Sequence, residues 1–105
     1  MSVQLLVIYP PPKDAAAFER AYRDEHLPYA GPRLISAGAT GVTTKRTLGS
    51  PNGAPALHWI SYIDFPSVDV AKACAQSQGG KEALQHAASI SSGGPTQVVL
   101  MGDAS

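Results

Sequence analysis

The segment YRDEHLPY, residues 22–29, carries the side chains of this 105-residue chain that are best suited to moving protons. At about 100° per residue of helix, Tyr22 and His26 follow Phe18 by about 40° and about 80°, so all three share one stripe, with Glu25 at its edge. Polar groups buried there without partners cost about 1–3 kcal/mol each, so they must meet hydrogen-bond partners, water or a ligand. Because an imidazole with an ordinary pKa of about 6.5 both accepts and donates protons at neutral pH, we predict proton transfer by His26, with Tyr22 or Glu25 orienting it or the ligand. Tyr29 is predicted to contact the same ligand.

The same residues also fit a purely structural role, and spacing alone leaves both interpretations open. A histidine in the last turn of a helix interacts favourably with the helix dipole at the surface. Tyr22 is more often a core aromatic with its hydroxyl tethered, and Glu25 more often a surface carboxylate. Arg20 and Asp24 lie on the opposite side, where they form a solvated i,i+4 pair that supports the helix.

A strand predicted over residues 56–65 supplies four more candidates by alternation. His58 and Tyr62 fall on one of its faces, whereas Trp59 and Ser61 fall on the other. The second set is bulkier and more apolar, which suits packing against helices or against a partner chain. Either pair could line a cavity beneath His26, so His58, Trp59 and Tyr62 are all candidate ligand contacts.

The first half of the chain is predicted to form a strand and a helix that position His26. The run QLLVIY favours a strand over residues 3–9, which ends at three consecutive prolines that cannot continue a ladder. Asp14 is a suitable N-cap for a helix over residues 15–27, and Pro28 is predicted to end that helix. Residues 28–40 carry two prolines and two glycines without a sustained period, and we predict a loop there.

The second half predicts a hairpin, a helix and a last strand. Strands over residues 41–48 and 56–65 flank the turn sequence GSPNGAP and should pair antiparallel. Ser67 can cap a helix over residues 68–78, which Gly79-Gly80 is predicted to interrupt before a continuation over residues 81–89. A fourth strand follows over residues 96–101.

This order predicts an α+β domain spanning residues 1–105. It is the βαββαβ pattern of the ferredoxin-like fold, a four-stranded antiparallel sheet with two helices on one face. The strands are apolar or β-branched on both faces, and only 15% of the residues are charged. We therefore predict a homodimer that packs the open sheet faces together, as in a dimeric α+β barrel.

Composition excludes several classes of partner. Eight basic residues balance eight acidic ones, which disfavours nucleic acid, and the longest apolar run is far too short to span a membrane. Cys74 is the single cysteine, which fits a cytoplasmic protein without disulfides. Neither paired histidines at ligand spacing nor a phosphate-binding glycine motif occurs, so no metal or cofactor is predicted.

The chain resembles the EthD family of small dimeric α+β barrel proteins. The resemblance covers about residues 3–100 and rests on a strand ending in YP, a helix closing in HLP, the GSPNGAP hairpin and the segment QSQGGKEA. It implies a ferredoxin-like dimer with a pocket between sheet and helices, and it places His26, Tyr22 and Pro28 near that pocket. A related methylmuconolactone isomerase uses a thiol in the third strand, where this chain has Ile63. That particular activity is therefore not expected.

Three functional hypotheses follow. The first is a cofactor-independent enzyme of the isomerase, cyclase/dehydratase or monooxygenase type that acts on a small hydrophobic organic compound, with His26 transferring the proton. The second is a non-catalytic ligand-binding or accessory protein of a degradation pathway. The third, less favoured, is a haem or flavin site that uses His26.

Overall fold

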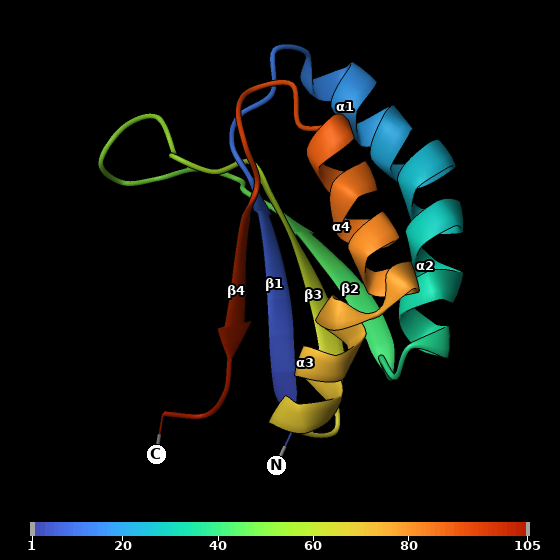
Figure 1. Cartoon of the computed structure of the whole chain (residues 1–105). Coiled ribbons are helices and arrows are strands. Elements are labelled where there is room, and N and C mark those ends of the chain that lie inside the picture. The colour runs from blue at the N-terminus through green and yellow to red at the C-terminus, as the bar shows by residue number, and fades with distance from the viewer. Residues whose placement is uncertain (1, 105) are drawn as a thin grey trace.

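The computed structural model describes residues 2–104 and confirms the predicted fold class. Its four strands form one antiparallel sheet in the order β2-β3-β1-β4, which is the ferredoxin-like order (Figure 1). The elements are β1 (Val3–Tyr9), α1 (Ala15–Ala21), a π-helical turn η1 (Tyr22–His26), α2 (Leu27–Ser36), β2 (Gly41–Arg46), β3 (Trp59–Phe65), α3 (Val68–Gln76), α4 (Gln78–Ser89) and β4 (Gln97–Met101).

The first helical arm consists of α1, η1 and α2, and it is longer than the sequence predicts. The prediction of a loop over residues 28–40 is wrong for residues 28–36, because the helix continues past Pro28 and Pro32 to Ser36. In η1 the N–H of Leu27 donates to the carbonyl of Tyr22, so the hydrogen-bond register changes immediately before Pro28. At such a change of register one backbone carbonyl lacks a helical partner in any case. The helix therefore tolerates the missing N–H of Pro28 at this position.

The second helical arm consists of α3 and α4, and it breaks between them at Ser77. The predicted interruption at Gly79-Gly80 is wrong. Ser77 has an extended backbone, and its side chain accepts a hydrogen bond from the N–H of Gly80 while donating one to the carbonyl of Cys74. A Cβ at position 80 would overlap that carbonyl, so the tight break between α3 and α4 requires glycine there. The glycines thus permit the second helix to start.

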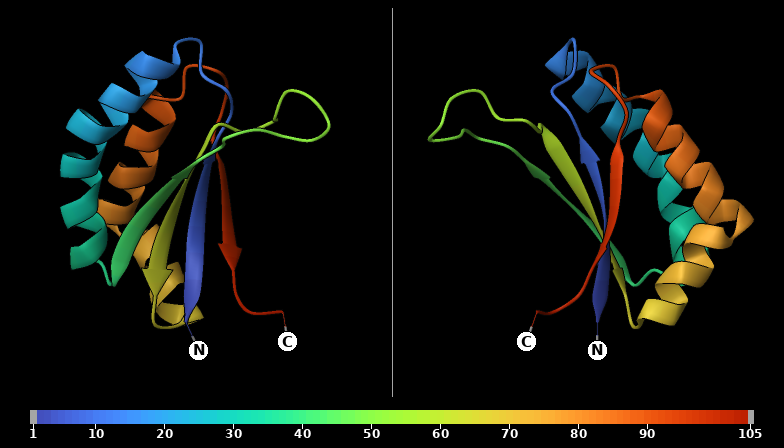
Figure 2. Two further views of the ribbon diagram at one scale, coloured as in Figure 1. Left: turned by 180° about the vertical axis from the view of Figure 1, so that it is seen from behind. Right: turned by 60° about the vertical axis from the view of Figure 1, so that its left-hand side comes forward.

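One face of the sheet carries the core, between the strands and both helical arms (Figure 2). Alternate residues of β1 and β3 are buried there, and the register pairs Tyr9 with Trp59 and Val7 with Ser61. This resolves the alternative left open by the third strand, because Trp59 and Ser61 face the helices whereas Tyr62 faces away.

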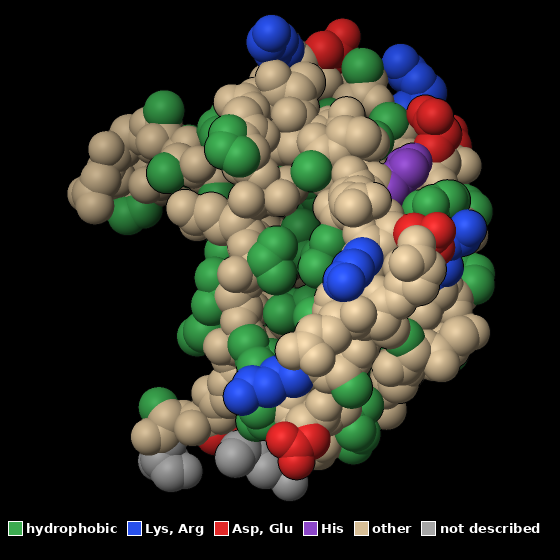
Figure 3. All heavy atoms as spheres, viewed as in Figure 1, with side chains coloured by type: hydrophobic (Ala, Val, Ile, Leu, Met, Phe, Trp, Pro, Cys, Tyr) green, Lys and Arg blue, Asp and Glu red, His purple; other side chains and the backbone are tan. Residues whose placement is uncertain are grey.

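The opposite sheet face carries no helix (Figure 2). The register places six apolar or aromatic side chains on it: Leu6, Ile8, Ile60, Tyr62, Val99 and Met101. All six are half-buried or exposed in the single chain. Hydrophobic side chains also follow the free edge of the sheet, beneath the projecting loop formed by residues 47–58 (Figure 3). Across residues 2–104, no helix is both long and apolar enough to cross a membrane.

Candidate functional site

His26 and His86 form a side-chain pair between the two helical arms. His26 closes η1 and is 6% exposed, while His86 comes from α4 and is half-buried. Their Nδ1 atoms lie 2.8 Å apart, a hydrogen-bond distance, and their rings are nearly parallel with centroids 5.1 Å apart. The pair therefore joins two helices that are 60 residues apart in the sequence.

The environment of the pair keeps His26 uncharged. Burial, together with the neighbouring His86, lowers the pKa of His26 to about 4. At neutral pH the His26 ring thus carries one proton, and its other nitrogen is an acceptor. Because Nδ1 is engaged with His86, Nε2 is the nitrogen available to another molecule.

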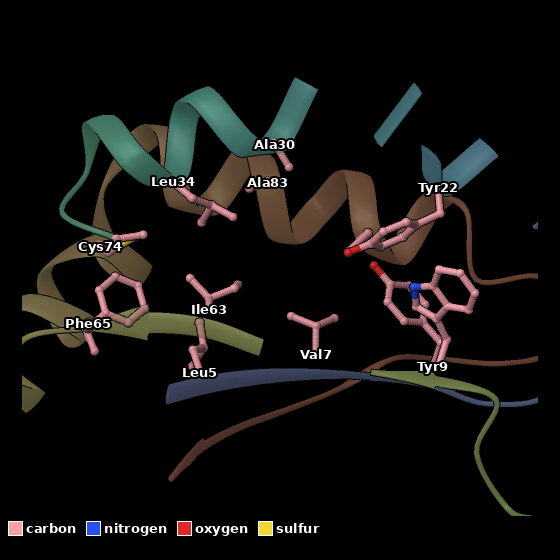
Figure 4. Close-up of a cluster of buried hydrophobic side chains, with 14 of the residues drawn as sticks. Leu5, Val7, Tyr9, Tyr22, Ala30, Leu34, Ile63, Phe65, Cys74 and Ala83 are labelled. Atoms are coloured by element: carbon pink, nitrogen blue, oxygen red, sulfur yellow. The ribbon is translucent and has the colours of Figure 1, made fainter. Parts of the chain in front are cut away.

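A cluster of hydroxyl groups lies beside His26, over the middle of the sheet. The Tyr22 hydroxyl is 2.5 Å from Ser61 Oγ and 3.0 Å from Thr44 Oγ1, and the Tyr22 ring centroid is 5.2 Å from that of His26. The Tyr9 hydroxyl is also buried and points to the same region (Figure 4), yet it has no hydrogen-bond partner among the described residues. Burial and the nearby Tyr22 raise the pKa of Tyr9, so this phenol stays protonated.

A small cavity separates the sheet from α2 and α4 at this point. Its free volume of about 20 Å³ holds about one water molecule. Polar groups come from His26, Tyr22 and Ser61, and the other walls are apolar: Val7, Leu27, Ala30, Gly31, Leu34, Val42, Ile63, Ala83, Leu84 and Ala87. The helix side of the cavity thus combines three alanines and a glycine with three leucines.

Two of the other predicted site residues lie near the cavity without lining it. Trp59 is buried on the helix side and packs on Tyr22 with ring centroids 5.2 Å apart, while its Nε1 has no partner among the described residues. Tyr29 stacks on the outer side of the pair, with its ring centroid 4.8 Å from that of His86.

The remaining predicted residues lie elsewhere. Glu25 is exposed to solvent. His58 sits just before β3, where its Nε2 is 3.0 Å from a carboxylate oxygen of Glu19. Tyr62 faces the open side of the sheet, with the Lys45 ammonium 5.7 Å from its ring centroid. Neither His58 nor Tyr62 therefore reaches the cavity.

His86, Tyr9 and Thr44 were not singled out by sequence reasoning. For Thr44 and Tyr9 the strand register would have been a sufficient signal, because each is on the same face as Ser61 or Trp59. For His86 the signal is weaker: it precedes Ala87 and follows Ala83 on the buried side of α4. In residues 2–104, three or more His, Cys, Asp or Glu side chains nowhere gather as a metal site would require.

Comparison with known proteins supports the fold and goes no further. Neither a protein-family model nor a curated protein sequence matches the chain. An ethyl tert-butyl ether D (EthD) family protein from Bacillus halodurans superposes with a TM-score of 0.81 at 20% identity, covering 98% of this chain and 99% of its own. A dimeric ferredoxin-like protein of unknown function from Jannaschia gives 0.73 at 14% identity, with 98% and 100% coverage.

A third solved structure is that of SnoaB, a cofactor-independent oxygenase from Streptomyces nogalater. Its TM-score is 0.63 at 13% identity, and the match covers 99% of this chain and 94% of that one. The chain thus shares its fold with EthD family proteins, as the sequence resemblance implies. Identities this low carry the fold alone, because one fold serves many chemistries.

Proposed function

We propose that this protein, which has the fold of EthD proteins, is a cofactor-independent enzyme that moves a proton on a small, mostly apolar organic molecule. One observation carries the proposal: a buried, neutral His26 lines an apolar cavity and leaves Nε2 free, beside a cluster of hydroxyl groups. An uncharged imidazole is competent to accept a proton from a bound molecule. The apolar walls favour a compound with little charge of its own.

The hydroxyl cluster suggests the kind of substrate. When a proton leaves a carbon next to a carbonyl, or leaves a phenol, negative charge develops on the substrate oxygen. The hydroxyls of Tyr22 and Ser61, which line the cavity, can donate hydrogen bonds to that oxygen, which stabilises the charge in a site shielded from water. Lactones, cyclic ketones and phenols therefore fit the arrangement best.

A lactone, cyclic ketone or phenol fits only if the cavity expands. Its present free volume of about 20 Å³ holds a water and not a ring compound. The helix side of the cavity carries the small residues Ala30, Gly31, Ala83 and Ala87 beside three leucines, so room for a ring compound requires an outward shift of α2 and α4.

The same proposal includes a homodimer formed through the open sheet face. An apolar sheet face with six half-buried or exposed apolar or aromatic side chains is a typical interface between copies of a chain. One solved protein of the same fold is described as dimeric. Pairing of two open faces would cover this surface on both copies.

Hydrogen exchange into ligands tests the catalytic proposal even while the product is unidentified. A panel of lactones, cyclic ketones and phenols is incubated with the protein in D2O, and each recovered compound is analysed by mass spectrometry and NMR. We expect deuterium to enter at least one compound next to its carbonyl, or new products to form. His26→Asn should lower the rate by about 100-fold or more, as is usual for loss of a general base, while Gln85→Ala on the exposed side of α4 should leave it unchanged.

One observation favours a second function, a non-catalytic ligand-binding or accessory protein. A pKa of about 4 makes His26 a weak base, and the other cavity groups besides His26 are hydroxyls. If compounds bind in ligand-observed NMR but return without deuterium and unchanged after long incubation, the binding function is correct and the catalytic proposal fails.

A further inference from the structure

We propose that His26 and His86 act as one unit that shares a single proton, so that His86 sets which nitrogen of His26 is free and conducts the proton between the cavity and solvent. His86 is thereby a positioning residue that works through His26. The direction of proton flow rests on the proposed function. The shared proton itself rests only on the geometry of the pair.

The short contact between two Nδ1 atoms restricts the pair to two neutral arrangements. A hydrogen bond at 2.8 Å needs one donor and one acceptor, and a neutral imidazole carries its proton on one nitrogen only. Either His26 donates from Nδ1 and presents a bare Nε2 to the cavity, or His86 donates and His26 presents an Nε2–H. The first arrangement makes His26 a base and the second makes it an acid. The two rings must therefore hold opposite tautomers.

Passing one proton through the pair converts the first arrangement into the second. A substrate proton binds His26 Nε2, and the Nδ1 proton of His26 moves to Nδ1 of His86. The cationic His86 then releases its Nε2 proton to water. No proton is gained or lost by the pair, the substrate has lost one, and the solvent has gained one. The reverse sequence reprotonates a product and restores the base.

Burial of the two rings supports this direction. His26 is 6% exposed and lines the cavity, whereas His86 is half-buried at the outer surface of α4. A proton taken up inside the cavity thus has a route to water through the second ring. Without His86, a proton held by His26 has no such hydrogen-bonded route among the described side chains.

The charged groups around the pair do not provide a carboxylate that would hold an extra proton there. On α2, Tyr29 stacks on His86, and the Arg33 guanidinium lies 3.7 Å from the Tyr29 ring centroid. On α4, Glu82 is paired with that same Arg33 at 3.2 Å. From η1 the pair meets the Tyr22 ring, and from the sheet Ser61 faces the cavity. The carboxylate of Glu82, one turn before His86 on α4, is thus already paired with a cation.

Nitrogen NMR of the ligand-free protein tests the shared proton. In protein labelled with ¹⁵N-histidine, we expect His26 and His86 to show complementary tautomers, or shifts averaged between the two, and one strongly downfield proton bonded to Nδ1. His86→Asn places an amide near the former Nδ1, so it keeps a hydrogen bond to His26 but cannot relay a proton. In that variant the His26 titration should shift to higher pH, because His86 no longer disfavours a positive charge on His26. Gln85→Ala should change neither signal.

The outcomes separate this inference from the proposed function. If both rings carry their proton on Nε2 and no hydrogen-bonded Nδ1 proton is seen, or if His26 titrates identically in His86→Asn, the shared proton is refuted whatever the enzyme does. If the tautomers are complementary but no compound takes up deuterium, the pair stands and the enzymatic proposal falls. With an active compound, His86→Asn should retain binding and slow deuterium entry on the order of tenfold. Unchanged deuterium entry would refute the relay.

Discussion

Acid should destabilise the fold through His26, and replacing this residue should remove that effect. The folded state holds the pKa of His26 at about 4, whereas an unfolded chain has the ordinary value of about 6.5. Between these values the unfolded state binds more protons, so stability is complete above about pH 6.5 and is lost as the pH falls toward 4. Across the whole window the difference of about 2.5 pKa units corresponds to about 3 kcal/mol.

A practical part of this window lies between pH 7 and pH 5. Over that range the linkage relation gives a loss of about 2 kcal/mol for a single group with these two pKa values. For a domain of about 100 residues this corresponds to a fall in Tm of about 10 °C. Asparagine at position 26 removes the titration while keeping an amide that can hydrogen-bond to His86. His26→Asn should therefore lose about 2 kcal/mol less than wild type between the two pH values.

Urea unfolding followed by circular dichroism at pH 7, 6 and 5 measures this difference. Other titrating groups contribute to both curves, so subtracting the variant from wild type isolates His26 even if the variant is less stable at every pH. Gln85→Ala serves as the control and should reproduce the wild-type slope. If His26→Asn loses the same stability as wild type between pH 7 and pH 5, His26 is not held neutral by burial and the account of the site is wrong.

Three further predictions test the hydroxyl cluster, the break between helices and the open sheet face. Tyr22→Phe removes a hydroxyl with two buried or half-buried partners and should lower the free energy of unfolding by about 1–3 kcal/mol in urea titrations. Gly80→Ala should destabilise strongly because its Cβ would overlap the carbonyl of Cys74, whereas Gly31→Ala, in the middle of α2 with open space around an added Cβ, should be neutral or stabilise by up to about 1 kcal/mol. Leu6→Lys places a charge on the open sheet face and should convert a dimer into a monomer in sedimentation velocity; a wild-type monomer at micromolar concentration would contradict the dimer.

The sheet could be predicted from sequence because its pattern is local. Alternation in β1 and β3, the turn between β2 and β3, and the lengths of the two crossovers restrict the topology to very few arrangements. What alternation cannot give is which face the helices cover, because both faces of β3 carry aromatic and apolar residues. Only the packed structure assigns Trp59 and Ser61 to the core and Tyr62 to the open side.

The histidine pair could not be predicted because its two members are 60 residues apart. Each helix carries one histidine near its buried stripe, and each, viewed alone, fits a surface position. Their contact depends on the distance and rotation of α2, η1 and α4 after both arms have packed on the sheet. Sequence reasoning therefore found His26 through its helix and missed His86 entirely.

The spacing of buried residues indicates that the first helical arm extends beyond Pro28, although proline at this position is typical of a helix end. Five buried residues, spaced four apart, run along it: Phe18, Tyr22, His26, Ala30 and Leu34. In a regular α-helix each step of four advances the side chain by about 40°, so such a stripe would rotate by about 160° and end on the solvent side. One π-helical turn holds an extra residue and sets the following helix back by about 100°, which returns Ala30 and Leu34 to the buried face. The strict four-residue spacing thus requires a widened turn, and the turn that supplies it ends at His26 and directs this ring into the cavity.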